Sequence, residues 1–226
     1  MSMNNGMSLG DFPDMLKNNE PFAKIKPAKV VFHVCVFLAA LLVNCAGCIL
    51  VSESMIPLYL DSILTIMVTA TSGLWAGLLC AVLSNGILTV FDYTMLPFMS
   101  CHMLTSFLAW SVFYRTSRRK VLYKRMGGAK PYFEIDTFLW AGLWSALSNA
   151  VLGNIISDVL FSSVTTPKID SGILSVYTAV PNLVFATYIV GFLTNLTDKM
   201  ISAVVSFAGY RLCMKLYETY VLPREK

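Results

Sequence analysis

Carboxylate and amide side chains interrupt the long apolar segments of this chain. The segment PLYLDSILTIMVTATSGLWAGLLCAVLSNGILTVFDY, residues 57–93, contains three of them, and a later apolar segment contains three more. Such groups are costly inside a membrane unless they pair, and they often mark a functional site there. Together they could bind a polar or cationic small molecule. The residues concerned are Asp61, Asn85, Asp92, Asn149, Asn154 and Asp158.

The heights of these residues along helices form a gradient. At ~1.5 Å rise per residue, Asn85 lies ~15 Å above Trp75, near the midplane of a ~30 Å hydrocarbon layer. Asn149 lies at a similar height above Trp140, and Asp158 lies ~25 Å or more above that tryptophan, at the outer boundary. A proton relay or ion channel would need polar groups through the full thickness. The gradient instead predicts a pocket that opens to the outside.

Each polar residue also has a purely structural interpretation. Asp61 and Asp198 could cap the N-termini of helices. Asn85 and Asn149 could form hydrogen bonds between membrane helices. The two interpretations remain open for every one of these residues when only the sequence is considered.

No metal site, cofactor or enzymatic activity is expected. The CAGC motif, Cys45 to Cys48, has metal or redox spacing, but it lacks a second cysteine pair and a nearby histidine, so helix packing explains it better. His33 and His102 fall on opposite sides of the membrane in the topology described below. The sequence contains no Walker, GxSxG, HExxH or dinucleotide-binding motif. We therefore expect no ATP hydrolysis by this chain and no nucleic-acid partner.

The composition is that of an integral membrane protein. Of the 226 residues, 56% are hydrophobic and 13% are charged, whereas soluble domains have about 25% charged residues. From Val30 to Tyr114 there is no Lys or Arg. A segment of that length must cross the lipid bilayer several times, because one crossing takes roughly 20 apolar residues.

The apolar runs predict an all-α bundle of six transmembrane helices within one membrane domain, residues 29–220. A hinge at Ser72-Gly73 separates the second and third spans. Residues 163–196 are expected to form an extracytoplasmic cap; if 173–196 also crosses, there are seven spans. The expected spans are 29–51, 58–72, 74–91, 96–114, 137–161 and 198–217.

The distribution of basic residues predicts the orientation. The loop 115–130 has seven basic residues and no acid, so the positive-inside rule makes it cytoplasmic. Lysines before the first span place residues 1–28 on the same side. With six spans the basic C-terminus is also cytoplasmic, and this favours six over seven.

Two segments resemble each other. WAGLLCAVLSNGIL, Trp75 to Leu88, returns as WAGLWSALSNAVL, Trp140 to Leu152, with a gap of a single residue. In the predicted topology both helices run in the same direction, so the pair would be a parallel repeat. Chance similarity between helices rich in small residues is the alternative.

Small residues cluster on the first span. Such residues let helices approach closely, so this surface either packs inside the chain or forms a docking face for a partner membrane subunit. The residues are Cys35, Ala39, Ala40, Ala46 and Gly47.

Two motifs carry a resemblance to a known family. PLYLDSILTIMVTATSGLWAGLLCAVLSNG resembles the PLFLDTIGT…GPWAG…TN signature of substrate-capture (S) components of energy-coupling factor (ECF) transporters. LTDKMISAVVSFAGYRLCMKL…LP is similar to the last helix of that group, which begins at Asp-Lys and ends at Leu-Pro. The resemblance covers about residues 30–223. Ser62, Leu64 and Leu74 depart from the pattern, which has Thr, Gly and Pro at these positions.

The resemblance implies a six-helix protein of the plasma (inner) membrane of a prokaryote. Such a protein binds a vitamin or related micronutrient from outside and delivers it with a transmembrane coupling subunit and two cytoplasmic ATP-binding subunits. The pocket of the family is built from the outer halves of helices and the loops between them. Here those regions contain Glu53, Asp61, Asn85, Asp92, Tyr93, Asn154, Asp158, Tyr177, Asn182 and Asp198.

Acids outnumber bases on the predicted outer surface, where the only bases are Lys168 and Lys199. We therefore expect a cationic or hydroxyl-rich substrate. The alternative function is a membrane sensor or receptor-like module that signals through a partner protein, and a membrane enzyme or scaffold is a third candidate.

Overall fold

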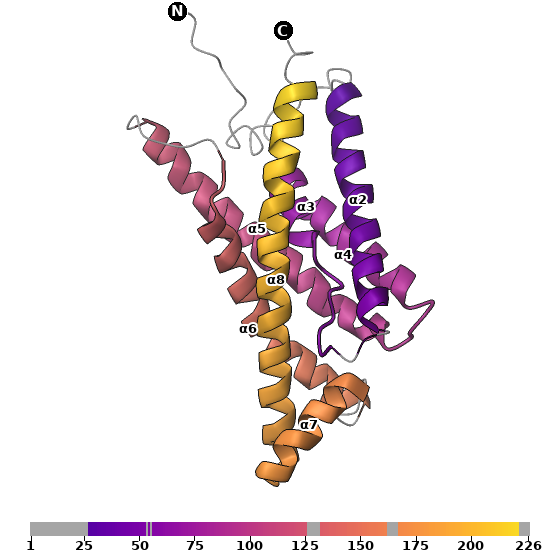
Figure 1. Cartoon of the computed structure of the whole chain (residues 1–226). Coiled ribbons are helices and arrows are strands. Elements are labelled where there is room, and N and C mark those ends of the chain that lie inside the picture. Colours follow the sequence, from indigo (N-terminus) through magenta and orange to yellow (C-terminus); the bar gives the residue numbers. More distant parts are fainter. Residues whose placement is uncertain (1–26, 53, 55, 126–131, 162–166, 222–226) are drawn as a thin grey trace, which may run out of the picture.

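The computed structural model describes residues 27–52, 54, 56–125, 132–161 and 167–221. The regular secondary structure of this part of the chain is all helical (Figure 1), as the sequence predicts. The seven helices are α2 (Pro27–Ser52), α3 (Thr65–Ser72), α4 (Leu74–Leu88), α5 (Met95–Arg125), α6 (Ile135–Phe161), α7 (Pro167–Ala179) and α8 (Leu183–Tyr220).

Three of the helices in the described part of the chain are long and apolar enough to cross a membrane, as in a membrane-embedded protein. They are α2, the Met95–Arg118 part of α5, and α6. At ~1.5 Å per residue each is more than about 35 Å long, against a hydrocarbon layer of ~30 Å. The helices α2 and α6 begin and end within two residues of the expected spans 29–51 and 137–161. The helix α5 begins one residue before the expected span 96–114.

The short helix α3 lies inside the bundle rather than crossing it. It has eight residues and is only ~12 Å long, and every residue from Thr65 to Thr71 is buried. The hinge is where the sequence predicts it. Gly73 has φ of 89° between α3 and α4, a conformation that glycine adopts without steric cost.

The expected second span, 58–72, is wrong in its first half. Residues 57–64 form no regular helix. Leu60 has φ of 47°, which right-handed helix does not allow. The N–H groups of Tyr59, Leu60 and Leu64 are instead bound by side chains from α2 and α8, as described below.

Two further boundaries differ from expectation. The basic segment 115–130 is not all loop, because α5 continues to Arg125; residues 126–130 lie outside the described part. There is no break between a cap and a last span at 196–198, since α8 is one helix of 38 residues. Its N-cap is Asn182, whose side chain accepts a hydrogen bond from the N–H of Phe185 at 3.0 Å.

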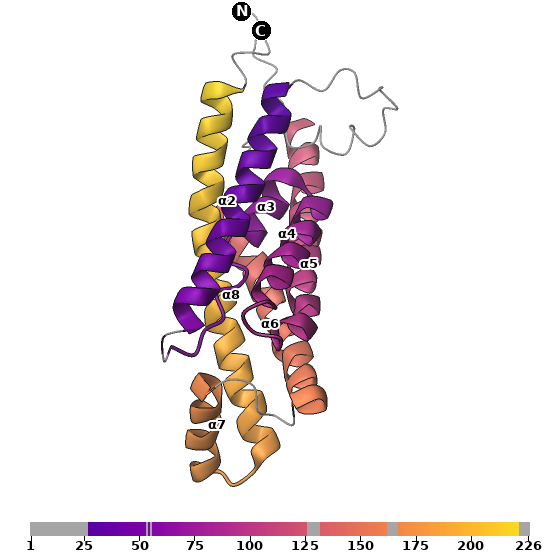
Figure 2. The same cartoon turned by 90° about the vertical axis from the view of Figure 1, so that its right-hand side faces the viewer.

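The bundle has two unlike ends (Figures 1 and 2). The first residues of α2 and α6 and the last residues of α5 and α8 lie at one end, with α7 beyond the other. The first end carries the exposed basic side chains of Arg115, Arg118, Arg211 and Lys215. We call it the basic end.

The interior changes along the bundle. Towards the basic end an aromatic cluster fills the core, with ring centroids 4.8–5.3 Å apart for Phe113 with Phe133, Phe113 with Phe138 and Phe138 with Tyr210. Towards the α7 end the core contains buried carboxylates, amides and a lysine. The buried carboxylates and amides therefore gather in one half of the molecule.

Candidate functional site

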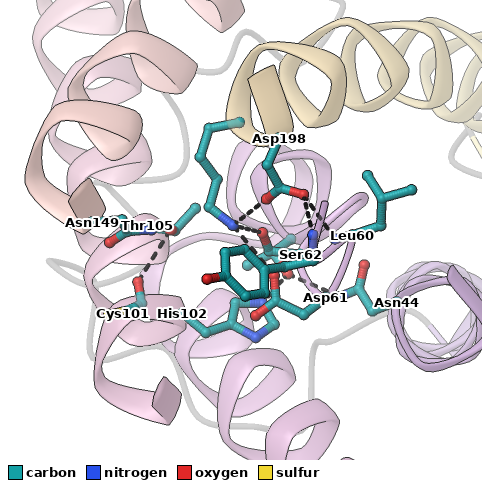
Figure 3. Close-up of polar contacts among 12 residues, drawn as sticks. Asn44, Leu60, Asp61, Ser62, Cys101, His102, Thr105, Asn149 and Asp198 are labelled. Carbon is teal, nitrogen blue, oxygen red and sulfur yellow. Dashed lines mark hydrogen bonds and ion pairs between the residues drawn. The ribbon is translucent and has the colours of Figure 1, made fainter. Parts of the chain in front are cut away.

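A buried lysine is the centre of the polar half. Lys199 on α8 is 3% exposed. Its Nζ donates to Asp198 Oδ2 at 2.7 Å, to Ser62 Oγ at 2.7 Å and to Asp61 Oδ1 at 3.2 Å. An ammonium has three N–H donors, so all of them are used. The dashed lines in Figure 3 show these contacts.

Side chains hold the irregular segment 57–64 in place. Asp198 Oδ1 accepts hydrogen bonds from the backbone N–H of Leu60 at 2.7 Å and of Tyr59 at 3.1 Å. Asn44 Oδ1 on α2 accepts one from the N–H of Leu64 at 2.9 Å. Irregular backbone at membrane depth is tolerated only where its polar groups are satisfied in this way. The result is a fixed non-helical backbone that directs Asp61 towards Lys199.

A histidine joins α5 to this framework. His102 is 1% exposed, and its Nδ1 lies 2.8 Å from Asn85 Oδ1. Asn85 Nδ2 donates to the Met95 carbonyl, so Oδ1 is the acceptor and His102 Nδ1 is the donor. Its Nε2 then accepts from the Thr65 hydroxyl, which in turn accepts from Asn44 Nδ2. Every donor finds an acceptor when the imidazole is neutral with hydrogen on Nδ1.

A cavity of about 40 Å³ lies beside the lysine, between residues of the irregular segment, α5, α6 and α8. Its lining includes the polar residues Asp61, Thr94, Asn149, Asn154, Ser157, Asn195 and Lys199. A cavity needs about 10–15 Å³ to hold one water molecule. The space therefore accepts a small polar group.

Asn149 leaves an acceptor at this cavity. The residue is 2% exposed, and its Nδ2 donates to Thr105 Oγ1 at 2.8 Å. Its Oδ1 is buried and has no hydrogen-bond partner within the described part of the chain. An unpaired buried carbonyl is expensive, and because its residue lines the cavity, a ligand there with an N–H group is a candidate partner for it.

One wall of the cavity is aromatic. Tyr59 and Phe98 both line it, and their rings stack with centroids 6.4 Å apart. Phe98 stacks in turn on Phe161 at 6.0 Å. Tyr59 also packs against the apolar cluster between α7 and α8, which includes Ile169. The hairpin of α7 and α8 therefore contacts Tyr59, which forms part of this wall.

Three of the predicted binding residues meet at the cavity: Asp61, Asn149 and Asn154. Asn85 is fully buried and bound to His102 and Met95. Asp92 accepts hydrogen bonds from the N–H and hydroxyl of Thr94. The others are outside the cavity lining: Asp158 is half-buried, and Tyr93, Tyr177 and Asn182 are exposed. Residue 53 lies outside the described part.

The sequence did not assign the central roles of Lys199, His102 and Asn195. Asp198 and Lys199 were expected at the start of a helix, where an N-cap explains an acid; in the structure they are near the middle of α8. The sequence signal for this cluster was a Lys next to an Asp within an apolar segment, because a charge inside a membrane helix needs a partner.

The small residues of α2 divide between two faces. Cys35, Ala39 and Ala46 are exposed, whereas Ala40 is fully buried. Gly47 is half-buried, and a Cβ there would meet Ile63 and the Leu60 carbonyl. The first three residues therefore form the outward small-residue face of α2, and the other two pack inside the bundle.

Comparison with known protein families, with curated proteins and with solved structures gives no match. What the cavity binds must therefore be inferred from its own residues and from their position in a membrane-embedded bundle.

Proposed function

We propose that this chain is the substrate-capture subunit of an ECF-type importer. It binds a vitamin or related micronutrient from outside the cell and delivers it with a transmembrane coupling subunit and two cytoplasmic ATP-binding subunits. The membrane is the plasma (inner) membrane of a prokaryote. ATP hydrolysis belongs to the partner subunits.

The observation that supports this proposal best is the cavity lined by Asn149, whose buried Oδ1 has no hydrogen-bond partner in the described part of the chain. Lys199, Asp61 and Asp198 lie beside it, inside an apolar bundle. Ionisable residues in a membrane interior are expensive and usually serve a function. A polar chamber in one half, above an aromatic core in the other half, suits capture from one side of the membrane.

The proposed orientation follows from charge. Arg115, Arg118, Arg211 and Lys215 are exposed at the basic end, and positive residues favour the cytoplasmic side. With this end in the cytoplasm the N-terminus is cytoplasmic, and α7 lies outside. We propose six crossings, in which the irregular segment 57–64 and α3 together form the second, α4 forms the third and α8 forms the last.

The coupling subunit would dock on α2. Cys35, Ala39 and Ala46 are exposed along this helix, and small residues allow close helix contact in membranes. Ala40 and Gly47, which face the bundle, would support α2 rather than touch the partner.

Native mass spectrometry of gently solubilised protein, with identification of the released small molecule, tests the proposal. We expect a vitamin-like ligand in a 1:1 complex, lost in Asn149→Leu and retained in the control Asp136→Asn, an exposed acid near the basic end. Bare protein, even after exposure to a pool of vitamins and precursors, would contradict capture. Co-purification with a kinase or cyclase instead of coupling-factor ATPases would favour a sensor.

A further inference from the structure

We propose that the cavity recognises a planar, positively charged nitrogen group with several N–H donors, such as an amidinium or guanidinium, attached to an apolar body. The group would lie between Asp61 and Asn149. This inference rests on the proposed function in taking the cavity as the capture site, and it names the chemistry of the captured molecule.

Lys199 cannot recognise an anion. Its Nζ is the one basic group in the lining of the cavity. All three of its N–H donors are directed at Asp198, Ser62 and Asp61. A carboxylate or phosphate of a ligand would have to displace one of these buried partners, which would leave that partner without its donor. The ammonium therefore organises the site and offers nothing to a ligand.

The cluster has one negative charge in excess. Asp61 and Asp198 share the single ammonium of Lys199, and His102 is neutral in the hydrogen-bond pattern described above. Asp198 accepts three hydrogen bonds, from Lys199 and two backbone N–H groups. Asp61 accepts from Lys199 through Oδ1 and from the Ser62 side chain, and its own side chain remains 12% exposed. A carboxylate has about four acceptor positions, so Asp61 has acceptor capacity left at the cavity.

The amide of Asn149 is fixed with its oxygen unpaired. The Thr105 hydroxyl donates to the Cys101 carbonyl at 3.1 Å, so the oxygen of Thr105 must accept from its other partner. That partner is therefore the N–H of Asn149, and the buried Oδ1 is the atom without a donor. Asn195 is oriented in the same way, since its Nδ2 donates to the Gly191 carbonyl at 2.8 Å. The ligand must therefore supply donors.

The size and walls of the cavity suit such a group. The cavity of about 40 Å³ exceeds the roughly 10–15 Å³ that one water molecule needs, so it has room for a small polar headgroup such as an amidinium. Tyr59 and Phe98 provide aromatic faces beside it. Such faces attract planar cations and pack against apolar bodies.

Three probes with one ring and different charges test the inference: benzamidine (cation), benzamide (neutral) and benzoate (anion). We expect calorimetric titration of the purified full chain to show benzamidine binding about tenfold or more tightly than benzamide, because hydrogen bonds to charged groups are stronger. Benzoate should bind weakest. Benzoate binding as tightly as benzamidine, or no binding of benzamidine, would overturn the proposal.

Two variants locate the interaction. Asp61→Asn should remove the preference for benzamidine over benzamide. Asn149→Leu should weaken the binding of benzamidine and of benzamide, the two probes with N–H groups. This variant keeps Asp61 and Lys199 intact, so it tests the proposal even if Asp61→Asn does not fold. Asp136→Asn is the charge-matched control and should keep the wild-type order. The proposal would be wrong if Asp61→Asn still preferred benzamidine over benzamide, or if Asn149→Leu bound both probes as tightly as the wild type.

The two proposals can fail separately. A native ligand that occupies the cavity but is neutral or anionic would overturn the inference and leave capture intact. Benzamidine binding that depends on Asp61, in a protein that takes no vitamin or precursor, would support the chemistry of the site and contradict the proposed function.

Discussion

Lys199 on α8 and Asp61 in the irregular segment before α3 lie 138 positions apart in the sequence, and their Nζ and Oδ1 atoms are 3.2 Å apart inside the bundle. Asp198, next to Lys199, binds the backbone of the same irregular segment. The last helix and the segment 57–64 are thus held together by one charged cluster, and this cluster forms a wall of the cavity.

Loss of the lysine charge should destabilise the protein strongly. Lys199→Met leaves Asp61 and Asp198 buried without their cation, and removal of one partner of a buried ion pair costs about 3–5 kcal/mol. We expect a much lower unfolding midpoint in detergent, measured by tryptophan fluorescence. Lys215→Met, at an exposed position on the same helix, is the control. Equal midpoints for the two variants would show that the cluster does not stabilise the fold.

The two asparagines that correspond in the internal repeat should differ in their effects. Asn85→Leu leaves His102 Nδ1 without its acceptor and should cost about 1–3 kcal/mol of unfolding free energy, with little change in ligand affinity. Asn149→Leu should weaken ligand binding and change stability less, because its Oδ1 has no partner to lose. Chemical unfolding and calorimetric titration of both variants check this crossed pattern. If Asn85→Leu weakened ligand binding and Asn149→Leu lowered stability instead, the roles assigned to Asn85 and Asn149 would be wrong.

Close packing of α6 on α8 should depend on a glycine. A Cβ at Gly142 would lie 2.7 Å from Ala203 Cβ and 2.9 Å from the Lys199 carbonyl oxygen. Gly142→Ala should therefore cost about 1–3 kcal/mol through overpacking. Gly86→Ala is the matched control in α4, since nothing lies within 4 Å of its Cβ, and it should stabilise that helix by about 0.5–1 kcal/mol. Thermal unfolding of both variants measures the difference, and a stabilising Gly142→Ala would contradict the packing.

The proposed orientation predicts which side a thiol reagent reaches. Tyr93→Cys replaces a residue 78% exposed near the α7 end, and Lys215→Cys replaces an exposed residue at the basic end. In right-side-out vesicles a membrane-impermeant maleimide should label the first variant, while the second should react only after permeabilisation. The unsubstituted protein, which has six free cysteines, gives the background. Labelling in the opposite order would invert the topology.

Some elements could be read directly from the sequence. The helices α2 and α6 begin and end within two residues of their expected bounds, and the α3–α4 turn falls at Ser72-Gly73. Long apolar runs and a glycine at positive φ are local signals, since a backbone in lipid must satisfy its own hydrogen bonds. The bounds follow from length and composition alone.

Other elements depend on partners that are distant in sequence. Residues 58–64 have the composition of a membrane helix, yet they are irregular because Asp198 and Asn44 bind their N–H groups. Asp198 has the sequence context of an N-cap, but it lies within α8 because its carboxylate is occupied by that segment.

The sequence by itself determined that this is a membrane-embedded helical protein with polar residues concentrated in part of its apolar interior. Only the tertiary structure decided which of these residues meet: Asp61, Asn149 and Asn154 at a cavity with Lys199, and Asn85 at His102 instead. The reason is physical. Apolar runs and turns form from local interactions, whereas a buried charge or amide takes its role from whichever group completes its hydrogen bonds, and that group can lie anywhere in the chain.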